Sequence, residues 1–480
     1  MAAALSVAVY LPTLTLTKHI WQDEVQILEL GRGVFRDLDQ THGMAWQVTK
    51  QRPAASVAYL GPSLQEISYR AFAPSPVGPR VSSILGAVLA SAALLGWLLS
   101  RGTIAWVAAA CSLLLLWDPL FVEGYRGARV DGWAMACMLC AMWIIARGFE
   151  SNKALQFKPS GWQVAAGLFI ALAGLVWVSA VLLLPLVALQ CLQGSGNRQP
   201  GELRPRIAAL VWIGVFALLF FAVLLIPLAP TLAAQFSDLR GVVGNKTSKE
   251  INLAACLTPY VRSPWVPLLA LAGIIYARLW GGGLALVAAT WGVLMTGAYV
   301  HRSVYLLPYF LVAIAASMTV LLRSNKGSRL KPIFGVAVLV LLLVWSVGLS
   351  LGARTLIAWK ERQFRNPDLL RVMLHDKISS QPIKAYLVPY ELYYAARELG
   401  WKAWRSYGSA NWEDSNLCVL LSDMDVVVQR ADGASQKLDS LMQEQGFTRQ
   451  TVAAGPSPAQ RQENYGEYLV YRRKHQESHL

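Results

Sequence analysis

Charged side chains are scarce in this sequence. Only 15% of its 480 residues are Asp, Glu, Lys or Arg, whereas 55% are hydrophobic. A soluble protein of this length carries about a quarter charged residues. Several runs approach or exceed the ~18–20 apolar residues that cross a bilayer. The composition therefore predicts a polytopic α-helical membrane protein rather than a soluble one.

Several motifs of common enzymes and transporters are also absent. The sequence has no Walker loop, no G-x-G-x-x-G leading a strand–helix unit, no H-E-x-x-H and no G-x-S-x-G. Cysteines number six, and Cys137 and Cys140 form a C-x-x-C inside an apolar run with no second pair. These absences argue against nucleotide-driven transport and common hydrolase chemistry. No metal site is predicted.

The net charge of +15 comes mostly from Lys and Arg in short loops between apolar runs. No basic stripe with interleaved aromatics accompanies them, so nucleic acid is not an expected partner. We interpret this excess of positive charge as the result of membrane topology and of contact with anionic lipid head groups.

The apolar runs predict about eleven spans. The run 162–192 would be about 46 Å long as one helix, so we expect two short spans joined near Trp177. The other expected spans are residues 2–17, 81–100, 103–117, 132–146, 207–229, 265–279, 282–299, 303–322 and 332–353.

Loop charges predict the orientation of these spans. Counted from an inside N-terminus, every short inward loop is basic, and the long segments 18–80, 230–264 and 354–480 lie outside. We therefore expect a membrane domain at 1–353, with an outer loop at 18–80 that contains a surface amphipathic helix through Val25, Leu28 and Val34.

Residues 354–480 have the composition of a small soluble α/β domain outside the membrane. Alternating and continuous apolar patterns predict its elements. The expected strands are Lys384–Pro389, Cys418–Leu421, Val426–Gln429 and Glu467–Arg472, and the expected helices are Glu391–Leu399 and Ser435–Gln445.

Asp23 and Glu24 follow the first apolar run directly. Carboxylates at a membrane boundary are costly unless they are used, and a carboxylate can accept the proton that an acceptor hydroxyl or amine loses during sugar transfer. The alternative is that both simply stabilise the N-terminus of a surface helix. The residues alone leave these two interpretations open.

A second group of charges, Glu123, Arg126, Arg129 and Asp131, lies on the same predicted face. Arginines beside carboxylates suit a phosphate leaving group, although the four could also pair only with one another. Arg302, at an outward turn, is a further candidate phosphate contact. Arg240, Lys246, Lys249 and Arg262 are weaker candidates in the outward loop before residue 265.

Four pieces of sequence resemble, in order, motifs of the GT-C superfamily of membrane glycosyltransferases, in the branch of the protein O-mannosyltransferases and lipid A aminoarabinose transferases. They are Trp21-Gln22-Asp23-Glu24 with Glu29 to Gly33, Gly61-Pro62 with Gly78 to Ser83, Arg129-Val130-Asp131, and Arg302 to Pro308. The resemblance covers most of residues 1–322.

The resemblance implies inverting transfer of a sugar from a polyprenyl-phosphate donor to a protein, lipid or glycan acceptor. It implies a reaction at the periplasmic or lumenal face, here a bacterial inner membrane. Asp23 would be the base with Glu24 beside it, Arg302 a phosphate contact and Asp131 a polar partner of the cavity. Some relatives bind a divalent cation, but the sequence shows no matched ligand set.

Two other classes stay open at this stage. A transporter or flippase would place charges near the middle of several spans and repeat one half in the other, and neither is visible. A polysaccharide ligase also uses polyprenyl carriers, but it would place its large outer loop late in the membrane domain rather than first.

Overall fold

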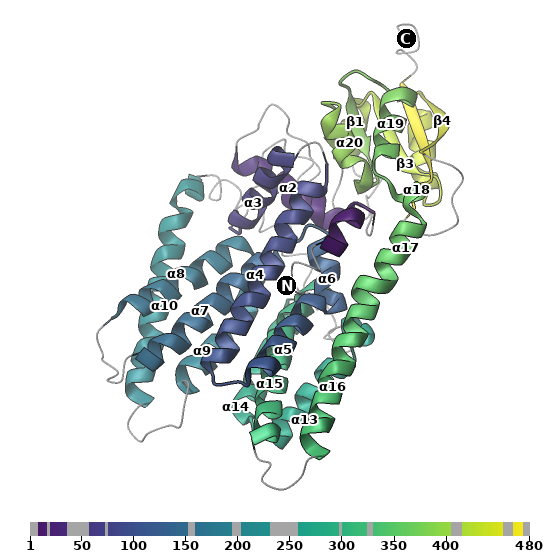
Figure 1. Ribbon diagram of the computed structural model, residues 1–480. Coiled ribbons are helices and arrows are strands. Elements are labelled where there is room, and N and C mark those ends of the chain that lie inside the picture. The colour runs from purple at the N-terminus through teal and green to yellow at the C-terminus, as the bar shows by residue number, and fades with distance from the viewer. Residues whose placement is uncertain are drawn as a thin grey trace.

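Figure 1 shows the computed structural model as a helical bundle with a small α/β domain at one end. The structure describes residues 8–16, 20–35, 57–72, 75–151, 159–193, 203–230, 258–296, 300–323, 330–404, 415–454 and 464–473.

The bundle consists of apolar helices of two lengths. Within the described residues, five are long enough to cross a bilayer, or six if the pair α5–α6, bent by 52°, is one span. Four shorter apolar helices accompany them, and the expected total of about eleven is not established. The helices are α4 (Val77–Ser100), α5 (Ala105–Trp117), α6 (Pro119–Arg126), α7 (Asp131–Ser151), α8 (Gly161–Val176), α9 (Leu184–Gln193), α10 (Leu203–Leu225), α13 (Trp265–Tyr276), α14 (Trp280–Met295), α15 (Leu307–Arg323) and α16 (Leu330–Val347).

Short 3₁₀ segments join or begin several of these helices. They are η1 (Leu11–Thr13), η3 (Val178–Leu183), η4 (Ile226–Leu228), η6 (Thr258–Arg262) and η7 (Val300–Leu306). Trp177 has an extended backbone between α8 and η3, so the predicted break in the run 162–192 is confirmed.

Small residues allow the close crossing of α4 and α7. A Cβ added to Gly86 would lie 2.7 Å from the Trp133 backbone nitrogen, and one added to Gly132 would lie 2.7 Å from that of Ala87. Such contacts are typical of membrane helices that pack through small residues. They fix the start of α7, where Asp131 lies, against α4.

Two helices of the outer loop, α2 (Gln22–Val34) and α3 (Leu60–Phe72), lie at the end of the bundle nearest the α/β domain (Figure 1). The sequence predicts a surface helix here, but most of α2 is buried, including the polar Gln26, Glu29 and Arg32. Val25 and Leu28 share a core with residues of the C-terminal domain. The reason is that this domain covers the side of α2 that would otherwise face water.

A helical connection leads from the bundle to the C-terminal domain. After α16 come a π-helical turn, η8 (Gly348–Ala353), and α17 (Arg354–Lys360), so that Ile333–Lys360 forms one apolar helix of 28 residues. The helix therefore continues past residue 353, where the sequence predicts the membrane domain to end.

The C-terminal domain contains a five-stranded sheet with strand order β2-β1-β3-β5-β4. β1 pairs in parallel with β2 and β3, whereas β5 pairs antiparallel with β3 and β4. The strands are β1 (Lys384–Leu387), β2 (Lys402–Trp404), β3 (Val426–Arg430), β4 (Phe447–Ala453) and β5 (Glu467–Arg473). The helices are α18 (Arg362–Arg365), α19 (Asp368–Lys377), η9 (Tyr390–Leu392), α20 (Tyr393–Glu398), α21 (Ser415–Ser422) and α22 (Gln436–Glu444).

Two sequence-based expectations are wrong in detail. Cys418–Leu421, expected as a strand, lies in helix α21, because a short apolar run fits a buried helix as well as a strand. The segment between Asp118 and Asp131, which lies outside the expected spans, contains helix α6, whose first backbone amides are capped by the Asp118 carboxylate.

Candidate active site

Arg129 holds two carboxylates together at the outer-loop end of α7. Its Nε donates to Asp131 Oδ2 at 2.5 Å, and its Nη1 donates to Asp23 Oδ2. The Asp131 side chain is only 4% exposed, whereas that of Asp23 is 30% exposed. The structure thus brings Asp23 to Arg129 and Asp131, which lie more than one hundred positions further along the chain, and leaves Asp23 accessible.

The trio contains unequal numbers of positive and negative groups. One guanidinium faces two carboxylates, so the trio carries a net charge of −1 when all are ionised. Since Arg129 remains charged, a proton bound by Asp23 would leave a neutral Arg129–Asp131 pair. Asp23 also lies in the first turn of α2, at the positive end of the helix dipole.

An aromatic frame surrounds the Arg129 guanidinium. Its Cζ lies 5.9 Å from the Trp21 ring, and the Trp21 indole donates to the Gly127 carbonyl at 3.0 Å. Trp21 also contacts His301 of η7, with ring centroids 4.8 Å apart. Tyr305, which is fully buried, interacts electrostatically with Asp131 and Arg129.

Ala128 has a left-handed backbone, with φ of 55°, directly before Arg129. Its carbonyl accepts a hydrogen bond from Gln65 Nε2 at 3.1 Å, and the same nitrogen donates to Ser83 Oγ at 2.6 Å. Such a conformation costs a non-glycine residue about 1–2 kcal/mol. The outer loop therefore holds a strained turn that aims Arg129 at both carboxylates.

Glu24 points away from Asp23 into a buried ion pair. Arg80 donates to both of its oxygens, at 3.1 and 2.9 Å, and both side chains are fully buried. Tyr394 of α20 donates to Glu24 Oε1 at 3.0 Å. Burial and the charge of Glu24 raise the pKa of Tyr394 well above its usual value, so the phenol is a neutral donor.

Two further carboxylates of the outer loop are bound by α20. Arg397 donates to both oxygens of the buried Glu66, at 3.0 and 2.7 Å, and Tyr393 donates to Glu29. Removal of one partner from a buried ion pair costs about 3–5 kcal/mol. Helix α20 of the C-terminal domain thus fixes the positions of α2 and α3, which carry Asp23 and Gln65.

Arg126 is a buried cation with spare donors. Its Nη2 donates to Thr13 Oγ1 at 3.0 Å and its Cζ lies 4.3 Å from the Tyr10 ring. Among the described residues, its Nε and Nη1 have no hydrogen-bond partner. It also lies in the field of Arg80 and Arg354. Buried donors without partners in a positive field are suited to an anion.

An apolar groove of about 710 Å³ adjoins this arginine. Thr13, which accepts from Arg126, forms part of its wall, between η1 and the helix that runs from α16 to α17. The remaining lining residues are almost all apolar: Val9, Pro12, Trp117, Val347, Leu351, Gly352, Thr355, Leu356 and Trp359.

Arg302 lies in η7 next to His301, and it donates to the Thr296 carbonyl. Arg262 and Arg354 both donate to Glu123 at 3.0 Å. Arg240, Lys246 and Lys249 lie outside the described residues. The structure thus brings His301, rather than Arg302, against the aromatic frame of the site.

Sequence reasoning did not single out Trp21, Gln65, Tyr305 or Tyr394 for the site. Trp21 belongs to the first of the motifs described above. No local sequence pattern distinguishes Tyr394, which lies 370 positions from Glu24. Within the described part of the chain, no group of three His, Cys, Asp or Glu side chains is close enough to hold a metal ion.

Comparison with known proteins relates the fold to solved structures. No family model and no curated protein matches the chain. ArnT from Cupriavidus metallidurans bound to undecaprenyl phosphate is similar with a TM-score of 0.59 at 14% identity, over 98% of this chain and 96% of that chain. Its apo state gives 0.57 at 15% identity, over 98% and 97%.

A mycobacterial arabinofuranosyltransferase, AftD, is similar with a TM-score of 0.52 at 15% identity. The match spans 98% of this chain but 41% of AftD. At these identities the likeness concerns the fold. The chain has a GT-C-like fold, as the resemblance of its motifs implies, and it is a polytopic α-helical membrane protein, as its composition predicts.

Proposed function

We propose that this chain, with its GT-C-like fold, is a glycosyltransferase that moves a sugar from a polyprenyl-phosphate donor to a protein, lipid or glycan acceptor. The observation that carries the proposal is the accessible Asp23 carboxylate held by Arg129 at the outer-loop end of the bundle. The GT-C-like fold of ArnT and AftD, both glycosyltransferases, supports it.

Asp23 is the proposed base. It accepts the proton of the acceptor hydroxyl or amine while the acceptor atom bonds to the anomeric carbon. The bond between that carbon and the phosphate oxygen breaks with inversion, and the electron pair leaves on the phosphate. Arg129 and Asp131 orient Asp23, and Glu24 fixes the first turn of α2 through Arg80.

The donor lipid is proposed to lie in the apolar groove beside η1. Its chain would contact Trp117, Leu351 and Leu356, and its phosphate would meet the spare donors of Arg126. A guanidinium binds phosphate through paired N–H groups. Arg302 is the proposed second phosphate contact, as the motif resemblance implies. The solved structure of ArnT with undecaprenyl phosphate supports a lipid of this class.

The reaction is proposed to occur at the periplasmic face of a bacterial inner membrane. The basic short loops support this orientation, because it places the outer loop and the C-terminal domain outside. Residues 354–480 are proposed as the extracytoplasmic domain, and the helix α17 as its connection to the bundle.

The test is transfer of labelled sugar from polyprenyl phosphate in membranes, comparing the native chain with Asp23→Asn. Asparagine keeps the shape but accepts no proton, so transfer should fall about 10²-fold or more. Asp376→Asn, at an exposed position of the C-terminal domain, is the matched control and should retain activity.

Two outcomes contradict the proposal. Full activity of Asp23→Asn, in a variant with the same unfolding temperature as the native chain, would show that another residue is the base. Absence of transfer by the native chain with a panel of polyprenyl-phosphate sugars would favour a transporter or flippase.

A further inference from the structure

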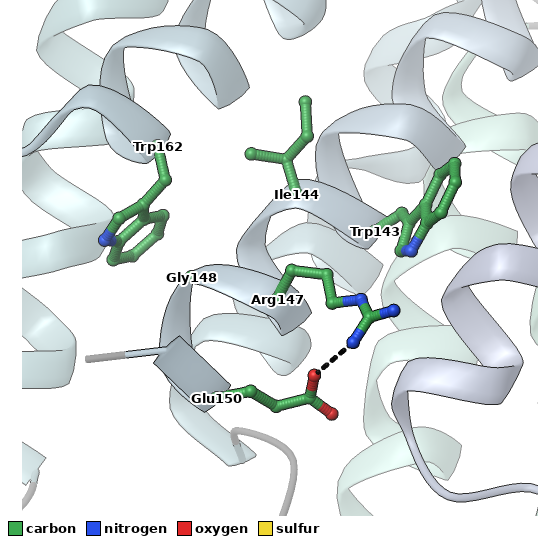
Figure 2. A pocket seen from close by; sticks show the side chains of 6 residues that line it. All are labelled: Trp143, Ile144, Arg147, Gly148, Glu150 and Trp162. Atoms are coloured by element: carbon green, nitrogen blue, oxygen red, sulfur yellow. Dashed lines mark hydrogen bonds and ion pairs between the residues drawn. The ribbon is translucent and has the colours of Figure 1, made fainter. Parts of the chain in front are cut away.

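A second pocket lies at the other end of α7, far from Asp131. It is lined by Trp143, Ile144, Arg147, Gly148, Glu150 and Trp162 (Figure 2). Arg147 follows Asp131 by sixteen residues, or about 24 Å along a helix. This approaches the ~30 Å hydrocarbon thickness of a bilayer. The pocket therefore lies near the membrane interface opposite the candidate active site.

Two indoles form opposite walls of the pocket, as Figure 2 shows. Trp162 packs on Phe149 with ring centroids 5.1 Å apart, and a Cβ on Gly148 would lie 2.4 Å from its ring. Trp143 packs on Gly96 of α4, where an added Cβ would lie 2.7 Å from the ring. The absence of a Cβ at Gly148 and Gly96 thus lets the two indoles pack closely against the helices. Trp is enriched at the level of lipid head groups.

Two opposite charges lie between these walls. Arg147 Nη1 donates to Glu150 Oε2 at 3.1 Å, and their side chains are 67% and 35% exposed. An exposed pair one helical turn apart contributes little to stability. A ligand that offers better partners to both groups can therefore separate them at little cost.

The charges select the class of ligand. An anionic head group would meet the Glu150 carboxylate, and a cationic one would meet Arg147. A zwitterion satisfies both, because its phosphate accepts two N–H groups of Arg147 and its primary ammonium donates to Glu150. The cavity, of about 570 Å³, falls within the ~300–1,000 Å³ range of small-molecule sites.

We propose that the Trp143–Trp162 pocket binds the head group of a zwitterionic phospholipid with a primary ammonium, phosphatidylethanolamine. The site is separate from the one assigned to the sugar donor, and it binds a structural lipid of the opposite leaflet. The proposal does not depend on the transferase activity.

The test uses the purified full-length chain in detergent, titrated with phosphatidylethanolamine, phosphatidylcholine or phosphatidylglycerol. Binding is followed by native mass spectrometry and by the unfolding temperature. We expect phosphatidylethanolamine to bind most tightly. In Arg147→Gln its affinity should fall about tenfold or more, since a hydrogen bond to a charged group contributes about 1.5–3 kcal/mol.

Glu150→Gln gives an independent readout because it should change selectivity rather than abolish binding. Without the carboxylate, phosphatidylglycerol should bind as well as phosphatidylethanolamine or better. Arg204→Gln is the matched control, since it removes an exposed arginine that does not line the pocket. Equal affinity of the native chain for all three lipids, or equal losses in Arg147→Gln and Arg204→Gln, would overturn the proposal.

Discussion

Arg129 contacts two carboxylates whose surroundings differ, and this difference separates their roles. Asp131 is enclosed and accepts from Nε and Nη2, whereas Asp23 keeps contact with solvent and accepts from Nη1. Under the proposed function, only the exposed carboxylate can reach an acceptor. At the scale of single residues, the geometry of the site thus depends on the orientation of the Arg129 guanidinium.

The strained turn before Arg129 gives a stability prediction. Ala128→Gly should raise the free energy of unfolding by about 1 kcal/mol, because glycine adopts a positive φ without the clash of a Cβ. Thermal unfolding of the two proteins measures the difference. Ala128→Val should have the opposite sign, and a lower stability for the glycine variant would contradict the strain.

Arg126 gives a prediction in which stability and activity change in opposite directions. Among the described residues no carboxylate pairs with it, so burial of its charge costs folding free energy. Arg126→Met should unfold at a higher temperature, yet its KM for the lipid donor should rise about tenfold or more.

Arg371→Met is the control for that change, because it removes a 49% exposed arginine of α19 that does not line the donor groove. Equal kinetic effects in the two variants would exclude Arg126 as a phosphate contact. A donor KM unchanged in Arg126→Met would do the same.

At the scale of elements, helix α20 acts on the site without touching it. Tyr394 donates to Glu24, the neighbour of Asp23, and Tyr69 and Tyr394 pack with ring centroids 5.7 Å apart. Arg397 covers the Tyr69 ring at 4.0 Å. The position of Asp23 therefore depends on an element at the far end of the chain.

Tyr394→Phe tests this dependence. Loss of the hydrogen bond leaves Arg80 as the partner of Glu24 among the described residues, and it should lower stability by about 1 kcal/mol. A looser first turn of α2 should lower kcat while the KM for the donor stays unchanged, since the donor groove is lined by other elements.

Tyr471→Phe provides the comparison, because it removes a buried phenol that is bonded to Gln429 inside the same domain. It should cost similar stability without a change in kcat. If both variants lose kcat equally, α20 has no positioning role.

At the scale of the whole molecule, alkaline pH should detach the C-terminal domain from the outer loop. Burial raises the pKa values of Tyr393 and Tyr394 well above 10. The unfolded chain releases these protons near pH 10, while the folded chain retains them. The folded state then binds more protons, so stability is full below pH 10 and falls as pH rises above it.

Tyrosinate absorbance and unfolding temperature, measured together across this range, check the prediction. Absorbance from the buried tyrosines should develop only with loss of structure. A smooth titration of all tyrosines near pH 10 in folded protein would contradict the buried network.

The sequence predicts the bundle better than it predicts the site. Long apolar runs locate most helices, and the length of run 162–192 locates the break at Trp177. The sequence shows the motifs that contain Asp23, Arg129 and Asp131, but the pairing of Asp23 with Arg129 depends on how α2 packs against the turn before α7. The partner of Glu24 could not be predicted, since hydrogen bonds over 370 positions leave no local pattern.

The helix from Ile333 to Lys360 has a consequence for how this chain can vary. Its 28 residues span about 42 Å, so it extends beyond a ~30 Å hydrocarbon layer and ends beneath the sheet. Each residue inserted into this helix would rotate the C-terminal domain relative to the bundle by about 100°. Tyr394 and Arg397 would then face away from their carboxylates. Insertions and deletions in this helix should therefore be tolerated only in multiples that restore the rotation, whereas loops of the same domain can change length freely.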